Sequence, residues 1–263
     1  MRVSNTIIGA IAGDIIGSVY EWNNIRTIDF PLFNDNCKFT DDSVLTLAVA
    51  DCILNKKDFA KTIWNYARRY PNRGYGGRFA EWINSRSLKP YHSYGNGSAM
   101  RVSSVGFAYN DLNQVLEISK QTAEVTHNHP EGIKGAQAIA ASIFFARSGK
   151  NKEFIQDYVS KTFSYKLNDS ISNIRQTYRF DETCQGSVPQ AITAFLESTD
   201  YETALRLAIS IGGDSDTIAC ITGGIADAFY KDIPAEIVDF VNDKLPVEFI
   251  ELINEFDKRY TYR

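Results

Sequence analysis

Apolar residues recur at helical spacing over most of this chain, and this periodicity restricts the possible folds more than any other feature. The segment after Pro246 shows it best, because its apolar side chains follow the i, i+3, i+4, i+7 rule. Strand signals are few and short, as at Ile25–Phe30. The pattern therefore predicts an all-α bundle. The apolar face of the last segment consists of Phe249, Leu252, Ile253, Phe256 and Tyr260.

Further helices are predicted from the same spacing and from signals at their ends. Thr199 or Asp200 can cap the helix that starts at Tyr201, and Pro189 suits a first turn. The chain has no linker, low-complexity stretch or solenoid repeat, so we expect a single domain over residues 1–263. The additional predicted helices are Asn5–Tyr20, Ser43–Leu54, Phe59–Tyr70, Pro130–Ala146, Pro189–Glu197, Tyr201–Ile211, Thr217–Tyr230 and Ala235–Asp243.

The composition excludes several classes of protein. The net charge of -4 argues against general nucleic-acid binding, which needs a surplus of Lys and Arg. Four scattered cysteines and three histidines, without a CxxC pair, disfavour a zinc ribbon and fit a reducing compartment. Asp14 interrupts the N-terminal apolar run too early for a signal peptide, and no segment reaches the ~20 apolar residues of a membrane helix. We expect a cytoplasmic monomer that does not contact membranes.

Glycine falls every four residues in the first predicted helix, at Gly9, Gly13 and Gly17. A strip without side chains lets a second helix come close, and tight packing explains these glycines fully. It does not explain Asp14, which stands beside the strip in an otherwise apolar helix. A buried carboxylate needs hydrogen bonds, a positive partner or a metal ion.

Two acidic clusters each stand directly before an apolar run. The first is Thr40–Ser43 and the second is Gly212–Thr217, and together they contain four aspartates. Capping explains any one of these acids, since Asp, Ser and Thr are preferred at helix N-termini. It does not explain the set, because one cap satisfies one or two backbone donors and four grouped carboxylates are costly without cations.

Magnesium, manganese or calcium would offset this charge, since hard cations take oxygen ligands. Adjacent aspartates at 41 and 42 can point to different ions, and the glycines at 212 and 213 allow close approach of a substrate. We therefore predict a site for two ions about 3.5–4 Å apart. Its ligands would be Thr40, Asp41, Asp42, Asp214, Asp216 and Thr217.

A loop of small residues runs from Tyr94 to Arg101. Exposed N–H groups in such a loop can cradle a phosphate, and Arg101 can offset its charge, although a plain turn is the commoner interpretation of an isolated Gly-Asn-Gly. The loop is neither a P-loop nor the GxSxG elbow of serine hydrolases.

His127 and His129 lie just before Pro130, which marks the start of a helix. The positive end of that helix suits a neutral imidazole and contact with an anion. The alternative is a capped helix with one buried, hydrogen-bonded histidine. We expect one of the pair to contact a ligand.

Taken together, these motifs resemble the ADP-ribosylglycohydrolase family, which includes the dinitrogenase reductase-activating glycohydrolase. Each motif is modest alone, but five in the family's order are highly specific. Ser43 stands where the family often has Thr, and Ser104 where it often has Pro, and neither removes a proposed ligand. The matching segments are Gly9–Gly17 with Glu21, Phe39–Ser43, Tyr94–Ser103, Thr126–Gly132 and Gly212–Thr217.

The resemblance implies a compact orthogonal helical bundle with a central cleft that holds two Mg²⁺ or Mn²⁺ ions. The six residues named above would be the ligands, and Glu21 matches a glutamate near the metals. The Gly95–Ser98 loop and His129 match regions that contact the diphosphate and the distal ribose, and Tyr94 is a candidate for adenine stacking. The predicted substrate contacts are Tyr94, Gly95, Asn96, Gly97, Ser98, Met100, Arg101, His129, Gly213 and Ser215.

The activity implied by this resemblance is metal-dependent hydrolysis of a glycosidic bond, which releases ADP-ribose from a modified protein, nucleic acid or small molecule. Asp41, Asp42 or Glu21 would accept the proton of the attacking water. One alternative is a catalytically silent protein of the same fold that binds ADP-ribose or has a structural role. A second is another two-metal hydrolase, such as a phosphatase. No nucleophile stands in a context suited to a serine or cysteine hydrolase.

Overall fold

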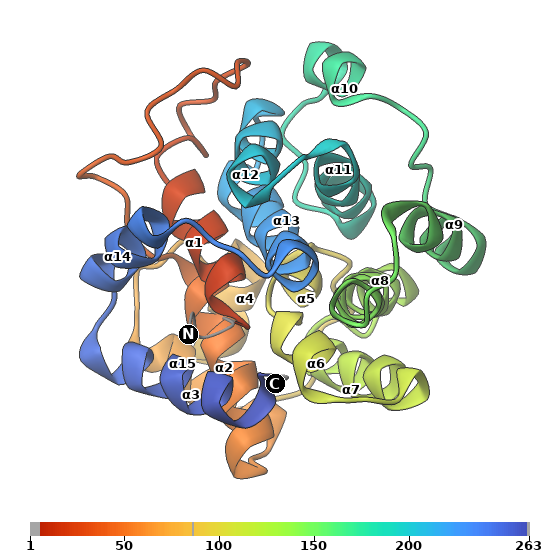
Figure 1. Cartoon of the computed structure of the whole chain (residues 1–263). Coiled ribbons are helices and arrows are strands. Elements are labelled where there is room, and N and C mark those ends of the chain that lie inside the picture. The colour runs from red at the N-terminus through yellow and green to blue at the C-terminus, as the bar shows by residue number, and fades with distance from the viewer. Residues whose placement is uncertain (1–5, 86, 262–263) are drawn as a thin grey trace.

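The computed structural model describes residues 6–85 and 87–261, and helices make up most of them (Figure 1). Within these residues no strand forms, and the isolated β-bridge between Gly95 and Thr183 is antiparallel. The predicted all-α class is confirmed. The helices are α1 Ile8–Gly17, α2 Asp41–Asn55, α3 Phe59–Arg69, α4 Gly77–Asn84, α5 Gly97–Met100, α6 Ser103–Ala108, α7 Leu112–Glu124, α8 Pro130–Arg147, α9 Lys152–Phe163, α10 Ile171–Thr177, α11 Cys184–Glu197, α12 Tyr201–Ser210, α13 Ser215–Tyr230, α14 Ala235–Lys244 and α15 Val247–Tyr260.

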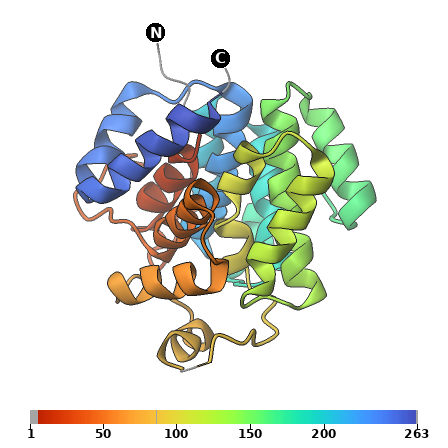
Figure 2. The ribbon, with the colours of Figure 1, turned by 90° about the horizontal axis from the view of Figure 1, so that it is seen from below.

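Helix α13 runs through the middle of the molecule (Figure 1). It is buried from Ser215 to Ala228, and α1, α8, α11 and α12 pack around it. A helix that is apolar on all sides needs neighbours on all sides, which explains this central place. An outer layer completes the bundle, with α2, α3 and α15 packed together on one side and α7 against α8 on the other (Figure 2).

The glycines of α1 face α13 along its length. A Cβ atom on Gly13 would lie 2.1 Å from the carbonyl oxygen of Ala219, and one on Gly17 would lie 2.6 Å from Cα of Asp216. Any larger residue would push the helices apart. The close helix contact predicted from the glycines is confirmed, and it brings the acid on α1 to the first turn of α13.

The short strand expected at Ile25–Phe30 is wrong. These residues belong to the long connection between α1 and α2, and most are exposed. A lone extended segment has no partner for its backbone groups and forms no sheet. Instead, the Arg26 guanidinium donates to the carbonyl oxygens of Arg175 and Tyr178, at 2.8 and 3.0 Å. The connection is thus held by a side chain.

The expected first turn at Pro189 is also wrong, because α11 begins at Cys184. Thr183 caps this helix, since its hydroxyl oxygen accepts from the Gly186 N–H at 3.1 Å. Pro189 lies inside the helix, where it removes one backbone donor. Residue 185, whose carbonyl that donor would have reached, is exposed to solvent. The other predicted helices occur with shifted ends, and Asn5 lies outside the described residues.

Six helices are missing from the sequence prediction, and three of them carry capping signals that were available. Asp111 caps α7, Asn151 caps α9 and Ser170 caps α10, each through its side-chain oxygen. Helices α5 and α6 have only four and six residues and no side-chain cap, so they are too short to show a periodic pattern. The six are α4, α5, α6, α7, α9 and α10.

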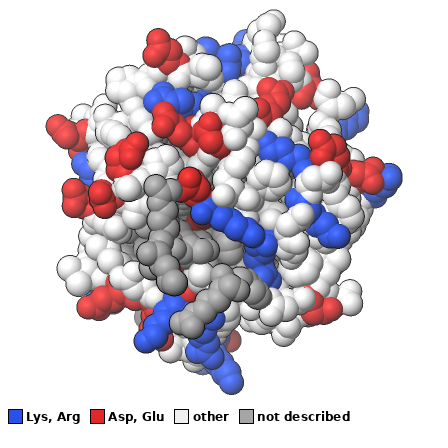
Figure 3. Space-filling view, viewed as in Figure 1, with Lys and Arg blue, Asp and Glu red and all other residues white. Residues whose placement is uncertain are grey.

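The surface charges and the helix lengths concern two further expectations, on nucleic-acid binding and on membrane helices. On the face shown in Figure 3, acidic and basic side chains are interspersed. Among the described residues, no helix combines the length and the apolar character that crossing a bilayer requires. The single domain, the monomeric state and the absence of general nucleic-acid binding stay predictions.

Candidate active site

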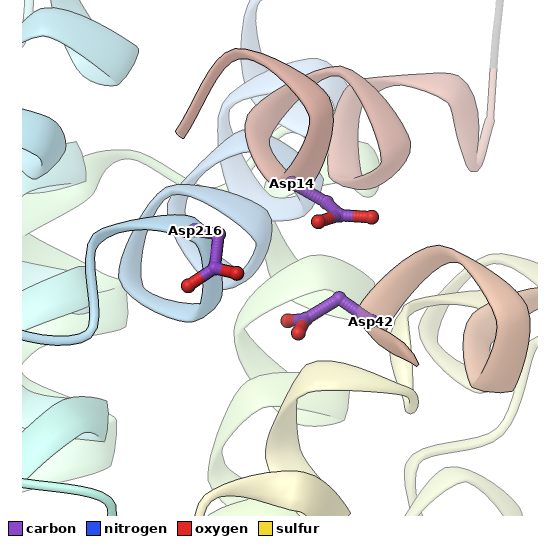
Figure 4. A group of neighbouring side chains, drawn as sticks. All are labelled: Asp14, Asp42 and Asp216. Carbon is purple, nitrogen blue, oxygen red and sulfur yellow. The ribbon is translucent and has the colours of Figure 1, made fainter. Parts of the chain in front are cut away.

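Three helices bring carboxylates to one place (Figure 4). Asp14 comes from α1, Asp42 from the first turn of α2 and Asp216 from the first turn of α13. Each offers an oxygen atom, and these atoms lie within 4.8 Å of one another. Asp216 belongs to a second group of this kind with Glu21 and Asp214. One carboxylate is therefore common to two groups, an arrangement that suits two neighbouring cations.

Helix capping accounts for Thr40 but not for the carboxylates around it. The Thr40 hydroxyl oxygen accepts from the Asp42 N–H at 3.3 Å, which caps α2. Asp214 stands at the N-cap of α13 and makes no capping hydrogen bond with its side chain. Asp42 Oδ2 accepts from the Thr217 hydroxyl at 3.2 Å, whereas its Oδ1 is buried without a partner among the described residues. An orphaned buried oxygen of this kind indicates a missing positive ligand.

Asp14, unlike Asp42, has hydrogen-bond partners for both oxygen atoms of its carboxylate. Its carboxylate accepts from the Thr40 N–H at 3.0 Å, from the Thr40 hydroxyl at 2.6 Å, and from both the N–H and the hydroxyl of Ser43. A buried carboxylate needs hydrogen bonds, a positive partner or a metal ion, and for Asp14 the structure shows the hydrogen bonds. Asp14 therefore ties α1 to the start of α2. The Thr40 hydroxyl gives its proton to Asp14 and accepts from the Asp42 N–H, so one of its two lone pairs remains available to a cation.

Burial and mutual repulsion act together on these acids. Burial raises the pKa of Asp41, Asp42 and Asp216 well above the usual range, and neighbouring carboxylates raise it further. Burial, followed by the charge of Asp214, raises the pKa of Glu21 to about 7. No Lys or Arg in the described part of the chain forms an ion pair with these acids. An oxygen-only set without a basic partner fits hard divalent cations.

The acids line one part of a cleft of about 520 Å³. Another part of the lining is cationic. Arg101 is fully buried, and its Nη2 donates to the Thr122 carbonyl and the Thr126 hydroxyl at 2.8 and 3.0 Å. Its Nε and Nη1 have no hydrogen-bond partner among the described residues. The cleft therefore joins an acidic region to a buried guanidinium with unused donors.

The residues of the small-residue loop are held by both sides of the cleft. The Asn96 side-chain amide donates to Asp214 Oδ2 at 2.6 Å and to the Ser187 hydroxyl at 2.9 Å, while its backbone N–H donates to the Glu182 carbonyl. Ser98 points elsewhere, because its hydroxyl donates to the Gly132 carbonyl at 2.7 Å. Five of the predicted substrate contacts line the cleft, namely Gly95, Asn96, Gly97, Met100 and Arg101.

Other predicted contacts lie outside the lining that the described residues form. Tyr94 is 45% exposed and packs against the ring of His129, which caps α8 by accepting from the Glu131 N–H at 3.1 Å. Gly213 has a φ of +71° and is tied to Asn24 through its N–H and its carbonyl, and Ser215 is buried behind it. Substrate contact by Tyr94, Ser98, His129, Gly213 and Ser215 stays a prediction.

The histidine that lines the cleft is His127. It is buried, and its Nδ1 lies 2.7 Å from the Thr126 hydroxyl. Burial, followed by the charge of Arg101, lowers its pKa well below 6.5, so the imidazole is neutral. The same hydroxyl contacts Arg101, which places a neutral ring beside the buried guanidinium.

Several residues of the cleft lining are not among those predicted from the sequence. Trp22 directly follows Glu21, and Glu182 precedes the Thr183 cap, so proximity to these residues was an available signal. Phe180 and Arg78 carried no such signal, because their loops reach the cleft only through tertiary packing. Asp14 is expected from the sequence to be a buried acid, but it is not among the six predicted ligands.

A family model described as ADP-ribosylglycohydrolase matches residues 1–261. The chain belongs to the ADP-ribosylglycohydrolase family. It is 25% identical to the human (Homo sapiens) protein ADP-ribosylhydrolase ARH3 over 87% of this chain and 85% of the relative. An uncharacterized protein of Archaeoglobus fulgidus is 26% identical over 95% and 93%.

A solved structure called "ADP-ribosylglycohydrolase-related protein complex" superposes with a TM-score of 0.74 and 21% identity, covering 97% of this chain and 96% of that one. It shows that the bundle is the fold of the ADP-ribosylglycohydrolase family. Membership of this family supports a hydrolase activity for the chain. The clustered acids of the chain agree with the family's general dependence on metal ions.

Proposed function

We propose that this chain hydrolyses the glycosidic bond between ADP-ribose and an acceptor group, in a reaction that depends on two Mg²⁺ or Mn²⁺ ions. The observation that carries the proposal is the position of Asp216. Its carboxylate belongs to two acidic groups at once, and each group has members in the lining of the same cleft. The family of the chain and its resemblance to ADP-ribosylhydrolases support the choice of substrate.

The residues that would hold the ions are the six predicted oxygen ligands. When bound, the ions supply compensating charge and polarise the oxygen atoms that they contact. The unpartnered Oδ1 of Asp42 and the remaining lone pair of the Thr40 hydroxyl fit this role. Asn96 supports it by fixing Asp214 through the amide bond described above. The proposed ligands are Thr40, Asp41, Asp42, Asp214, Asp216 and Thr217.

The diphosphate of the substrate would lie at the cationic part of the cleft. Arg101 offers the N–H donors of two nitrogen atoms, Nε and Nη1, that the described protein does not use, and charge-assisted hydrogen bonds to phosphate are among the strong ones. The backbone of Gly95–Gly97 lines the same cleft, and glycine permits close approach. These groups would orient ADP-ribose with its reacting ribose towards the acids.

Hydrolysis requires a group that takes a proton from the attacking water. Glu21 reaches the cleft from the loop after α1, and Asp41 and Asp42 reach it from α2. All three stay candidates for this general base. Carboxylates on both sides of the sugar would also stabilise the oxocarbenium-like charge that develops as the glycosidic bond breaks.

The experiment offers the purified protein a panel of ADP-ribosylated proteins, ADP-ribosylated nucleic acids and O-acetyl-ADP-ribose, with Mg²⁺, with Mn²⁺ and with a chelator. We expect release of ADP-ribose from at least one substrate with metal only. Asp42→Ala and Asp216→Ala should abolish release and metal binding, which calorimetry measures. Asp51→Asn is the matched control, since this buried acid of α2 pairs with Lys57 more than two turns away from Asp42.

Two outcomes would contradict the proposal. Release of inorganic phosphate instead of ADP-ribose would indicate a phosphatase. Tight binding of ADP-ribose without turnover on any substrate would indicate a silent member of the family.

A further inference from the structure

Thr126 connects two side chains of the cleft lining, those of Arg101 and His127. Its hydroxyl oxygen accepts from Nη2 of Arg101 at 3.0 Å and lies 2.7 Å from Nδ1 of His127. Thr126 is fully buried, and His127 is 4% exposed. The backbone N–H groups of Thr126 and His127 both donate to the Ala123 carbonyl in the last turn of α7. The three side chains therefore form one buried chain of hydrogen bonds on a fixed backbone.

The direction of each hydrogen bond in this chain follows from the groups that make it. Arg101 has only donors, so the Thr126 oxygen must accept from it. The hydroxyl hydrogen then needs an acceptor, and Nδ1 of His127 is the one that the described residues supply. A proton on Nδ1 would leave the buried hydroxyl hydrogen without a partner, which costs a hydrogen bond. Nδ1 is therefore the acceptor in this pair.

The Nε2 atom of His127 faces the small-residue loop. Because the ring is neutral and Nδ1 accepts, its one proton lies on Nε2. Nε2 makes no hydrogen bond with the described residues. A Cβ atom added to Gly97 would lie 3.2 Å from Nε2, and one added to Gly95 would lie 3.5 Å from it. Glycine at these two positions thus leaves space next to the Nε2–H, in a cleft that all three residues line.

The tautomer decides what His127 can bind. With its proton on Nε2, the ring presents a donor to the cleft, and this donor can bond a phosphate oxygen, which has only lone pairs. With its proton on Nδ1, the ring would present a lone pair at the same place and would repel a phosphate. The proposed function places the diphosphate beside Arg101 and the Gly95–Gly97 backbone, where this nitrogen lies.

We propose that Thr126 is a positioning residue of the diphosphate site, because its hydroxyl fixes His127 as the Nε2–H tautomer and keeps that donor turned towards a phosphate oxygen. The inference rests on the proposed function, since it assigns a task within that same site. A threonine that only fills volume in the core would have no influence on which ring nitrogen carries the proton, and this difference makes the proposal testable.

The first experiment identifies the tautomer by NMR and needs no turnover. The chain has three histidines, so proton–nitrogen spectra of the imidazoles contain few signals, and loss in His127→Gln identifies those of His127. At about pH 8, above the usual histidine pKa of about 6.5, we expect a protonated Nε2 and an unprotonated Nδ1. Thr126→Val removes the hydroxyl but keeps the shape, and should move both nitrogen signals towards the average of the two tautomers. Thr126→Ser should keep the signals of the parent.

The NMR result separates this inference from the proposed function. A proton on Nδ1 in the parent protein, or nitrogen signals that Thr126→Val leaves in place, would overturn the inference even in an active enzyme. An Nε2–H tautomer that depends on the Thr126 hydroxyl supports the inference even if ADP-ribose release fails.

The second experiment measures the effect on the substrate by steady-state kinetics of ADP-ribose release. Thr126→Val should raise KM about tenfold, as for loss of one hydrogen bond to a charged group, with kcat changed less than about twofold. Thr126→Ser should have the KM of the parent. In a His127→Ala background, Thr126→Val should raise KM by less than about a further twofold. A full further rise in that background would contradict an action of Thr126 through His127.

Thr193→Val is the matched control for the loss of a buried threonine hydroxyl. The Thr193 side chain is also buried, and its hydroxyl donates to the Pro189 carbonyl at 2.8 Å within α11, outside the cleft lining. This variant should leave KM and the His127 nitrogen signals unchanged. Equal effects of the two valine variants on these quantities would overturn the proposal, because loss of any buried hydroxyl would then be sufficient.

Discussion

Replacing Gly13 by alanine tests how helix packing builds the site. The added Cβ would meet the Ala219 carbonyl oxygen at 2.1 Å, about 1.3 Å closer than the 3.4 Å at which ordinary contact begins. That oxygen belongs to the backbone of a buried helix, so no flexible side chain can move aside. The two helices must separate along their contact, and Asp14, the next residue, moves with α1.

The size of the effect follows from two opposing contributions. Overpacking of a well-packed core costs about 1–3 kcal/mol, and this contact lies at the severe end. Alanine restores up to about 1 kcal/mol through its higher helix propensity. A net loss of about 2 kcal/mol should lower Tm by about 4–8 °C for a chain of this size.

Thermal unfolding followed by circular dichroism measures this change. Gly77→Ala is the control, because Gly77 is also helical and has no heavy atom within 4 Å of an added Cβ, so its Tm should not fall. Calorimetry should also show weaker Mg²⁺ binding for Gly13→Ala, since the bonds from Asp14 to Thr40 and Ser43 would be strained. A Tm within about 1 °C of the parent, with unchanged metal binding, would refute the reasoning.

Three further predictions follow from other parts of the molecule. Mg²⁺ or Mn²⁺ at about 100 times its Kd should stabilise the protein by about 2.7 kcal/mol, which differential scanning fluorimetry measures as a rise in Tm. A chelator or Asp216→Asn should abolish this gain, because both acidic groups share Asp216. A full gain in the variant would exclude Asp216 as the shared ligand. Arg101→Lys should raise KM for an ADP-ribosylated substrate about tenfold, as expected for one lost bidentate contact, while an unchanged KM would remove Arg101 from the phosphate site. Burial raises the pKa of Asp257 to about 6 from 3.8, so its stabilising contribution is complete below pH 3.8 and is lost as the pH rises through 6. The ionised acid then costs about 3 kcal/mol at most, and Asp257→Asn should raise Tm more at pH 7 than at pH 5 in thermal melts; an equal effect at both values would contradict this.

The long amphipathic helices and their caps were accessible from sequence because neighbouring residues determine them. Pro130 starts α8, and Asp200 caps α12 through a capping box with Thr203, as adjacent side chains and backbone donors dictate. The same locality explains the failures. Cys184–Val188 carries no helical pattern of its own, and α11 includes it because Thr183 supplies a cap. Ile25–Phe30 has strand-like residues, but no partner strand exists in the described part of the chain.

The site residues also fall into those that local sequence identifies and those that only tertiary contacts bring together. Residue type and local context identified the aspartates at the starts of α2 and α13, because several acids before an apolar run conflict with burial unless something compensates them. Whether the two clusters meet depends on contacts that no local pattern encodes. Asp42 and Thr217 are 175 residues apart and lie 3.2 Å from each other. His127 rather than His129 lines the cleft for the same kind of reason, since tertiary packing decides which ring faces inwards.

Sequence by itself determined the helical class, the glycine strip and the oxygen-rich donor set, because these follow from side-chain chemistry and from spacing of a few residues. Tertiary structure alone decided that α1 and α13 touch through backbone atoms, that the Asp14 carboxylate is hydrogen-bonded to the start of α2, and that the ring of Trp22 stacks on that of Phe180. These outcomes depend on how remote helices exclude volume from one another in a densely packed interior.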